Sequence, residues 1–163
     1  MGVSVIQMKK VLFVILILSC TQNLFAQKKD TASFSKSAVY AEVLGVAYYY
    51  SINYERILVG KKDKLSLRLG LSVIKDVVYV SSFPVMLNYI SGDRNNRFEA
   101  GGGTLVSVIY SSNPYLEKAL AFSLGYRYQR PNGKFLFRAA ITPVIYSSNY
   151  FYVGAGISFG YVF

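Results

Sequence analysis

Hydrophobic and polar residues alternate along much of the chain, most clearly in the last segment, 151–163. Residues at every second position of a β-strand lie on the same face of the sheet. In this segment one face would carry only apolar and aromatic side chains, while the other is rich in glycine and serine. The pattern therefore predicts a strand whose apolar face consists of Phe151, Val153, Ala155, Ile157, Phe159, Tyr161 and Phe163.

Four further segments, 65–73, 98–105, 122–129 and 135–142, alternate in the same way, and their apolar faces carry no charge. A charge on the lipid-facing side of a membrane barrel costs about 2–4 kcal/mol near the middle of the bilayer. A soluble β-sandwich or lipocalin-like barrel also alternates, but it buries its apolar face. The export signal and the terminal Phe163 favour the inverted arrangement, with the apolar face towards lipid.

Short polar stretches separate the alternating segments and predict the turns. Asn132-Gly133 is a strong signal for a two-residue hairpin. We expect three turns at one end of the strands and loops at the opposite end. The predicted turns are 61–64, 93–96 and 131–133, and the clearest loops are 111–114 and 147–149.

Together these signals predict an all-β fold, an eight-stranded antiparallel transmembrane β-barrel over residues 38–163. The region 38–58 is ambiguous, because it could form one long bent strand. Single-chain bacterial barrels have an even number of strands and short periplasmic turns, so we divide the region into two strands. The predicted strands are 38–45, 48–58, 65–76, 83–91, 97–110, 119–130, 134–146 and 151–163.

The composition agrees with strands, because 53% of the residues are hydrophobic and the chain contains 15 Tyr, 11 Phe and 13 Gly. The net charge of +10 would also fit a nucleic-acid-binding protein. However, Lys and Arg are not gathered on one amphipathic segment, and the hydrophobic content is high for such a module. We therefore expect no nucleic-acid partner.

The first 26 residues predict a cleaved signal peptide. The basic segment 8–10 precedes an apolar run at 11–18, and Ala26 provides the small residue at the cleavage site. Residues 27–37 are polar and too short for a domain. We interpret them as a periplasmic lead-in to the barrel.

Other interpretations of the N-terminus stay open. The only cysteine, Cys20, would be the lipidated residue of a lipoprotein, although Leu18 stands where a small residue is expected. A retained transmembrane helix is a second alternative, but the apolar run is short for one. Met8, directly before two lysines, begins a better signal peptide than Met1.

Several motifs carry a family resemblance: Phe25-Ala26-Gln27 at the end of the signal peptide, YYSINYER at 49–56, LRLG at 67–70, FPVMLNY at 83–89, GYRY at 125–128 and GISFGYVF at 156–163. Through them the whole mature chain resembles the small outer-membrane β-barrel proteins of the Bacteroidota, within the OmpA/OmpX-like class. The resemblance implies an outer-membrane location, with Phe163 as the assembly signal for the barrel-assembly machinery. It implies little about function, because most such proteins have no assigned activity.

Six charged residues on predicted inward faces form the main candidate site, a charged layer in the lumen. Symmetric pairing about 61 and 62 would place Glu55 opposite Arg68, and the hairpin at Asn132-Gly133 would place Arg127 opposite Arg138. Two opposed guanidinium groups need an acid nearby, for which Glu99 is the first candidate and Glu42 the second. The layer consists of Glu42, Glu55, Arg68, Glu99, Arg127 and Arg138.

This layer has two interpretations. An eight-stranded barrel is just wide enough for side chains to fill, so the layer can fill and fasten the barrel. Alternatively, it forms a gated polar path that opens when Glu and Arg exchange partners. Further inward residues favour a plug over an open pore, namely Tyr40, Leu44, Tyr49, Met86, Leu105, Ile109 and Val144.

Basic residues also gather at the predicted turns and would form a rim at the periplasmic end. Such a rim either attracts anionic lipid headgroups or is only solvated, and the sequence does not separate the two. The rim consists of Lys61, Lys62, Lys64, Arg94, Arg97, Arg130 and Lys134.

We therefore expect a structural, envelope-integrity or interaction role in the outer membrane, with a narrow gated channel or transporter as the alternative. An enzyme is not expected, because acyl-transfer chemistry commonly needs a Ser with a His base and the chain has no His. We expect no cofactor, since no metal cluster or phosphate loop stands out. Gly101-Gly102-Gly103 indicates barrel packing or bending. The expected partners are outer-membrane lipid and the barrel-assembly machinery, and the protein is expected to be a monomer.

Overall fold

The computed structural model describes residues 34–60, 62–75, 78–92 and 95–163. The predicted signal peptide, with Cys20 and the cleavage site after Ala26, lies outside the described residues. So do most of the predicted lead-in and two residues of the predicted basic rim, Lys61 and Arg94.

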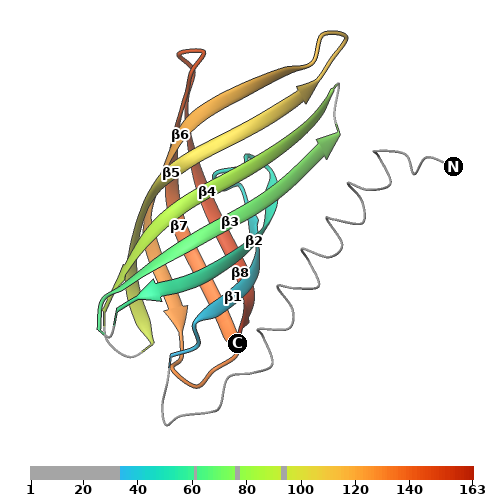
Figure 1. Ribbon diagram of the computed structural model, residues 1–163. Coiled ribbons are helices and arrows are strands. Elements are labelled where there is room, and N and C mark those ends of the chain that lie inside the picture. Colours follow the sequence, from blue (N-terminus) through green and yellow to red (C-terminus); the bar gives the residue numbers. More distant parts are fainter. Residues whose placement is uncertain (1–33, 61, 76–77, 93–94) are drawn as a thin grey trace, which may run out of the picture. The chain divides into compact units, whose positions relative to one another are not determined.

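Eight antiparallel strands form one closed barrel in chain order (Figure 1). The barrel closes because β1 pairs with β8 as well as with β2. The predicted fold class is confirmed. The strands are β1 (Ser37–Val43), β2 (Tyr50–Val59), β3 (Lys64–Lys75), β4 (Tyr79–Ser91), β5 (Asn96–Tyr110), β6 (Tyr115–Gln129), β7 (Phe135–Tyr146) and β8 (Phe151–Val162).

The region 38–58 forms two strands, as the even strand count required. The link between them, 44–49, contains two non-glycine residues in the left-handed backbone region, Leu44 (φ 57°) and Tyr48 (φ 73°). Such residues are uncommon outside glycine, and here they turn the chain sharply between two short strands.

The strands β4 and β6 each begin four residues earlier than the sequence predicted, at Tyr79 and Tyr115. Their polar early residues, such as Ser82 and Glu117, resemble a loop in the sequence. In the structure these residues continue the ladder with β5, where Ser107 lies opposite both of them. The central strand β5 therefore has paired neighbours along its full length.

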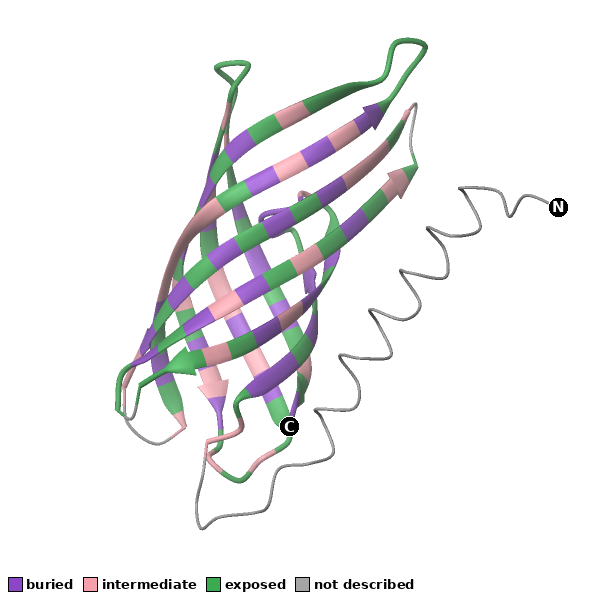
Figure 2. Cartoon of the chain, viewed as in Figure 1, coloured by how far each residue is buried: buried purple, intermediate pink, exposed green. Residues whose placement is uncertain are grey.

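Buried and exposed residues alternate along the strands (Figure 2). The outward positions are dominated by apolar and aromatic side chains, whereas many inward positions hold Ser, Asn, Glu or Arg. This distribution is the inverse of a soluble barrel and suits an apolar exterior against lipid. No helix in the described part of the chain is long and apolar enough to cross a bilayer.

The two ends of the barrel differ. One end, here called the terminal mouth, contains the start of β1, the end of β8 and the connections 60–63, 92–95 and 130–134. The other end, the far mouth, contains the connections 44–49, 76–78, 111–114 and 147–150. All of these connections are short, so the strands rather than the loops form the candidate sites.

Candidate functional site

Six strands each place one charged side chain in the barrel interior. The strand alternation brings these side chains inward, because each shares a face with the serines, asparagines and small residues that line the lumen. None is more than 3% exposed. They are Glu42 on β1, Glu55 on β2, Arg68 on β3, Glu99 on β5, Arg127 on β6 and Arg138 on β7.

The six side chains form one ion-pair chain of alternating sign, in the order Arg68, Glu42, Arg138, Glu99, Arg127, Glu55. The Arg127 Nη1 atom lies 2.7 Å from Glu55 Oε2 and 3.2 Å from Glu99 Oε2. Arg138 donates from both Nε and Nη2 to the Glu99 carboxylate, so this pair is bidentate. Arg68 Nη2 pairs with Glu42 at the other end of the chain.

The strand register explains the order of this chain. Glu55 lies opposite Arg68, and Arg127 lies opposite Arg138. The two opposed guanidinium groups share the Glu99 carboxylate, and Glu42 Oε1 lies 3.8 Å from Arg138 Nη1. Glu55 and Arg68 do not pair across their ladder, since Glu55 contacts Arg127 and Arg68 contacts Glu42.

Neutral side chains complete the hydrogen bonding of the ion-pair chain. Arg68 Nε donates to Asn53 (2.9 Å), and Arg127 donates from Nε and Nη2 to Gln129 Oε1 (2.9 and 2.8 Å). Ser66 donates to Glu55, and Ser158 donates to Glu42. The sequence analysis did not single out these four neutral residues. Their parity with the charged residues was the signal that could have found them.

Tyr40 lies within the charged layer rather than beyond it. The Cζ atoms of Arg138 and Arg68 lie 4.8 and 5.6 Å from the centre of its ring. Stacking of a guanidinium on an aromatic face is favourable, and the ring separates two like charges. Tyr40 also belongs to a small apolar cluster with Ala38, Leu136 and Val162.

Several buried polar atoms near the chain have no hydrogen-bond partner among the described residues. Buried polar groups in proteins are hydrogen-bonded, often to ordered water. The interior beside the ion-pair chain is therefore polar enough to hold water. The atoms are Tyr40 Oη, Arg68 Nη1, Ser72 Oγ, Asn88 Nδ2 and Oδ1, Ser123 Oγ, Arg138 Nη1 and Thr142 Oγ1.

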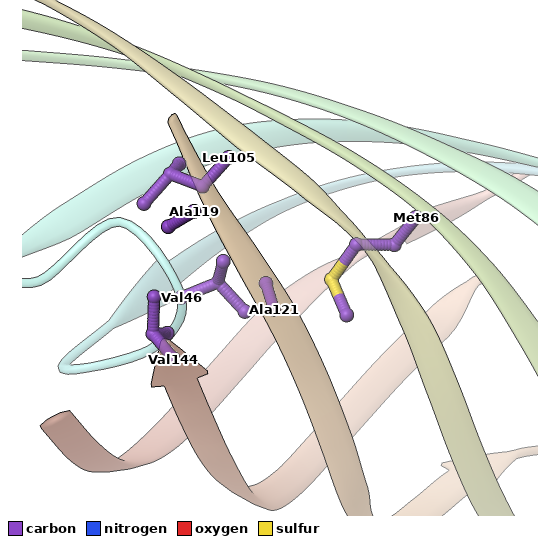
Figure 3. Close-up of a cluster of buried hydrophobic side chains, with 6 residues drawn as sticks. All are labelled: Val46, Met86, Leu105, Ala119, Ala121 and Val144. Atoms are coloured by element: carbon purple, nitrogen blue, oxygen red, sulfur yellow. The ribbon is translucent and has the colours of Figure 1, made fainter. Parts of the chain in front are cut away.

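An apolar cluster lies in the half of the barrel towards the far mouth (Figure 3). Val46, from the 44–49 link, is fully buried there and comes from outside the strands. This link folds into the barrel interior. The cluster, here called the apolar plug, consists of Val46, Met86, Leu105, Ala119, Ala121 and Val144.

The prediction that Leu44 and Tyr49 point inward is wrong, because both are more than half exposed. The strand alternation does not continue through the link, since its left-handed residues reverse the chain. Tyr48 fastens the link: its ring stacks on Tyr152 at 4.3 Å, and its hydroxyl hydrogen-bonds that of Tyr150 at 3.2 Å. This hydrogen bond is the main cause that raises the pKa of Tyr48 to about 12.

Comparison with known proteins identifies the fold. The structure is similar to the N-terminal β-barrel domain of OprF from Pseudomonas aeruginosa, with a TM-score of 0.57 and 16% identity. It is also similar to Ail, the attachment invasion locus protein of Yersinia pestis, with a TM-score of 0.52 and 13% identity. The fold is that of an eight-stranded outer-membrane barrel. Identities this low show the shared fold alone.

These similarities extend over most of each molecule. They cover 78% of this chain and 96% of the OprF domain, and 79% of this chain and 97% of Ail. No family model matches the sequence, and no curated protein matches it. The charged layer and the plug are therefore interpreted from this chain alone.

Two residues of the predicted basic rim lie inside the outer-membrane barrel. Lys64 and Arg97 are only 5% and 7% exposed, so placing them on a solvated rim is wrong. Lys64 has the same parity as Arg68, and Arg97 has the same parity as Glu99, so the alternation directs both inward. The Phe34 ring lies at this end, 4.7 Å from Lys64 Nζ and 4.3 Å from Arg97 Cζ.

The other described rim residues, Lys62, Arg130 and Lys134, lie at the terminal mouth outside the strands. Arg130 Nε donates to the Tyr128 hydroxyl (2.7 Å), and Lys134 Nζ lies 5.7 Å from the Tyr161 ring centre. Phe163 exchanges two backbone hydrogen bonds with Ser37. Among the described residues no group of His, Cys, Asp and Glu side chains has the arrangement of a metal site.

Proposed function

We propose that this chain is an outer-membrane barrel with a side-chain-filled lumen and a structural or interaction role in envelope integrity. The observation that carries the proposal is the succession of two barriers in one lumen. The ion-pair chain joins six of the eight strands, and the apolar plug lies nearer the far mouth. An eight-stranded barrel is narrow enough for side chains of this kind to occupy its interior.

The orientation and partners follow from the same fold. The terminal mouth faces the periplasm, where single-chain bacterial barrels have their termini and short turns. Residues 1–26 direct export, and the barrel-assembly machinery inserts the mature chain as a monomer. The apolar exterior contacts outer-membrane lipid, and Lys62, Arg130 and Lys134 attract anionic headgroups. The role is not enzymatic, and an origin in the Bacteroidota stays a prediction from the sequence motifs.

Ion conductance of the refolded mature protein in a planar lipid bilayer tests this proposal. A filled lumen is expected to give no discrete openings when gel mobility and protease protection show that the protein is folded and inserted. Removal of the Val46 side chain, as Val46→Gly, leaves the ion-pair chain in place and is expected to stay silent as well. Discrete openings of the unmodified protein would contradict a filled lumen.

A narrow gated channel is the second candidate function. The observation that favours it is the set of buried polar atoms without protein partners, because water at these atoms would form a hydrated path beside the ion-pair chain. In that case openings are expected in the unmodified protein, and Arg127→Ala is expected to change their size or lifetime. Openings that are identical in Arg127→Ala would exclude the ion-pair chain as the gate.

Phe163→Ala tests the proposed assembly signal. The ring is 37% exposed and contacts Tyr161, with 6.2 Å between ring centres, while the hydrogen bonds to Ser37 use only the backbone. We expect a several-fold lower amount of barrel in the outer membrane of cells, but an unfolding midpoint in detergent close to that of the unmodified protein. Phe135→Ala, which removes another exposed ring at the same mouth, is the control. Equal membrane levels of both variants would contradict the assembly role.

A further inference from the structure

A cavity of about 280 Å³ lies at the far mouth, beyond the apolar plug. It is bounded by the 44–49 link on one side and by the inward residues of β3 to β7 on the other. β1 and β2 are the shortest strands, with 7 and 10 residues, so the taller strands form most of its wall. The cavity is lined by Ala47, Tyr48, Tyr49, Ile74, Val78, Val80, Ser82, Leu105, Ser107, Ile109, Glu117 and Tyr146.

Most of this wall is apolar, with few polar groups. Ile74, Val80 and Ile109 contribute aliphatic surface. Ser82 and Ser107 hydrogen-bond each other at 2.8 Å, which leaves one hydroxyl proton of the pair available. Ligand cavities in proteins typically combine an apolar wall with a small number of placed polar groups.

Glu117 supplies the only acidic group of the wall. Its side chain has inward parity on β6, whereas the neighbouring Lys118 has outward parity and is exposed. Its Oε1 atom accepts a hydrogen bond from Ser148 at 2.7 Å. Among the described residues Glu117 has no cationic partner, unlike the three glutamates of the ion-pair chain.

The aromatic residues of the wall add to the preference for a cation. Tyr49 and Tyr146 line the same cavity as Glu117. Aromatic faces attract ammonium groups, and a carboxylate forms charge-assisted hydrogen bonds with them. An anionic ligand such as a fatty acid would be repelled by Glu117.

We propose that the far-mouth cavity binds a small organic cation with one ammonium group and a compact apolar body. The ammonium group would lie at Glu117 and the apolar body against Leu105 and Ile109. An apolar cavity of about 150 Å³ binds benzene, so this cavity has room for one aromatic ring and a short alkyl amine. The site is separate from the ion-pair chain and does not depend on whether the lumen conducts.

Titration calorimetry with 2-phenylethylamine tests the site, with the mature protein in a non-ionic detergent that carries no competing ammonium group. The neutral 2-phenylethanol and the anionic 3-phenylpropionate are the matched probes. We expect saturable binding of one amine per barrel at micromolar to millimolar concentrations, and weaker binding of both other probes. Equal affinity for the three probes, or no binding of the amine, would overturn the proposal.

Glu117→Gln is expected to weaken binding of the amine by about tenfold or more, because it removes a charged hydrogen-bond acceptor. Asp63→Asn is the matched control, since it removes the same charge at the terminal mouth, where Asp63 accepts a hydrogen bond from Ser91. Ile109→Trp, which fills the cavity, is expected to abolish binding while Glu117 is retained. Unchanged amine binding in Glu117→Gln would overturn the assignment of the cation to this carboxylate.

Discussion

Glu99→Gln is expected to lower the free energy of unfolding of the barrel by about 3–5 kcal/mol, the cost of breaking a buried ion pair. Glu99 contacts both Arg127 and Arg138, which lie opposite each other on β6 and β7. Without its charge Arg138 keeps only Glu42, at 3.8 Å. Two facing guanidinium groups would then be left in a narrow, low-dielectric interior.

The position of a residue in the ion-pair chain predicts the relative size of the effect. Arg127→Ala leaves Glu55 without its cation and Glu99 with Arg138 alone, so we expect a loss similar to that of Glu99→Gln. Glu55→Ala removes an end of the chain and leaves Arg127 paired with Glu99, so its loss should be smaller. Urea unfolding in lipid vesicles, followed by circular dichroism and gel mobility, measures these differences. Fluorescence is less useful, because the chain has no Trp.

Two controls separate the loss of an ion pair from a general effect of substitution. Glu117→Gln makes the same chemical change at the rim and is expected to change stability by less than about 0.5 kcal/mol. The double variant Glu99→Met with Arg138→Met removes both members of the bidentate pair and should be more stable than either single variant. Unchanged unfolding midpoints for both Glu55→Ala and Arg127→Ala would contradict an energetic role of the layer.

Gly103→Ala is expected to destabilise the barrel by about 2–3 kcal/mol, a cost typical of overpacking. A Cβ atom at Gly103 would contact the backbone of β4, with Met86 Cα only 2.7 Å away and the Val85 carbonyl oxygen closer still. Backbone atoms in a paired ladder cannot move aside as a flexible side chain can. The spacing between β4 and β5 would therefore have to increase, and the ladder hydrogen bonds would weaken.

Gly102→Ala is the matched control for this prediction. A Cβ atom at Gly102 would lie 3.5 Å from the Phe122 ring, an ordinary contact. Its effect should be neutral or slightly stabilising, because alanine reduces the conformational freedom of the unfolded chain. Unfolding midpoints measured side by side would show this difference. Equal destabilisation by both substitutions would indicate that this segment is sensitive to any side chain and not to contact with β4.

The alternation of the sequence was sufficient to predict the barrel, because one residue in two must face lipid and lipid excludes charge. Prediction was less accurate at the far mouth, where the starts of β4 and β6 were missed by four residues each. Lys118 projects outward from β6 there, and a charge in that position resembles a loop in the sequence. Pairing with the long strand β5 decides the matter, and this is information that a local pattern does not contain.

The site was predictable only where strand parity applied. Parity places Glu99 and Arg138 inward, but side-chain length and direction decide that Glu55 contacts Arg127 and not the opposed Arg68. The 44–49 link could not be predicted, because its two left-handed residues are not glycines and leave no signal. For Lys64 and Arg97 the signal was present, since their parity matches that of known inward residues. The proximity of turns led to the opposite assignment.

The unequal lengths of the strands have a consequence for the surrounding bilayer. The 7 residues of β1 extend about 23 Å along the strand, and a tilt of about 40° reduces this to roughly 18 Å of height. The 15 residues of β5 give roughly 38 Å by the same reasoning. A barrel usually presents an apolar band of about 25 Å. Lipid beside β1 must therefore thin, or the barrel must lean towards that side, and each ångström of mismatch costs a fraction of about 1 kcal/mol. The protein would create a thin spot in the membrane along one wall, and it would partition into membranes that are thin already.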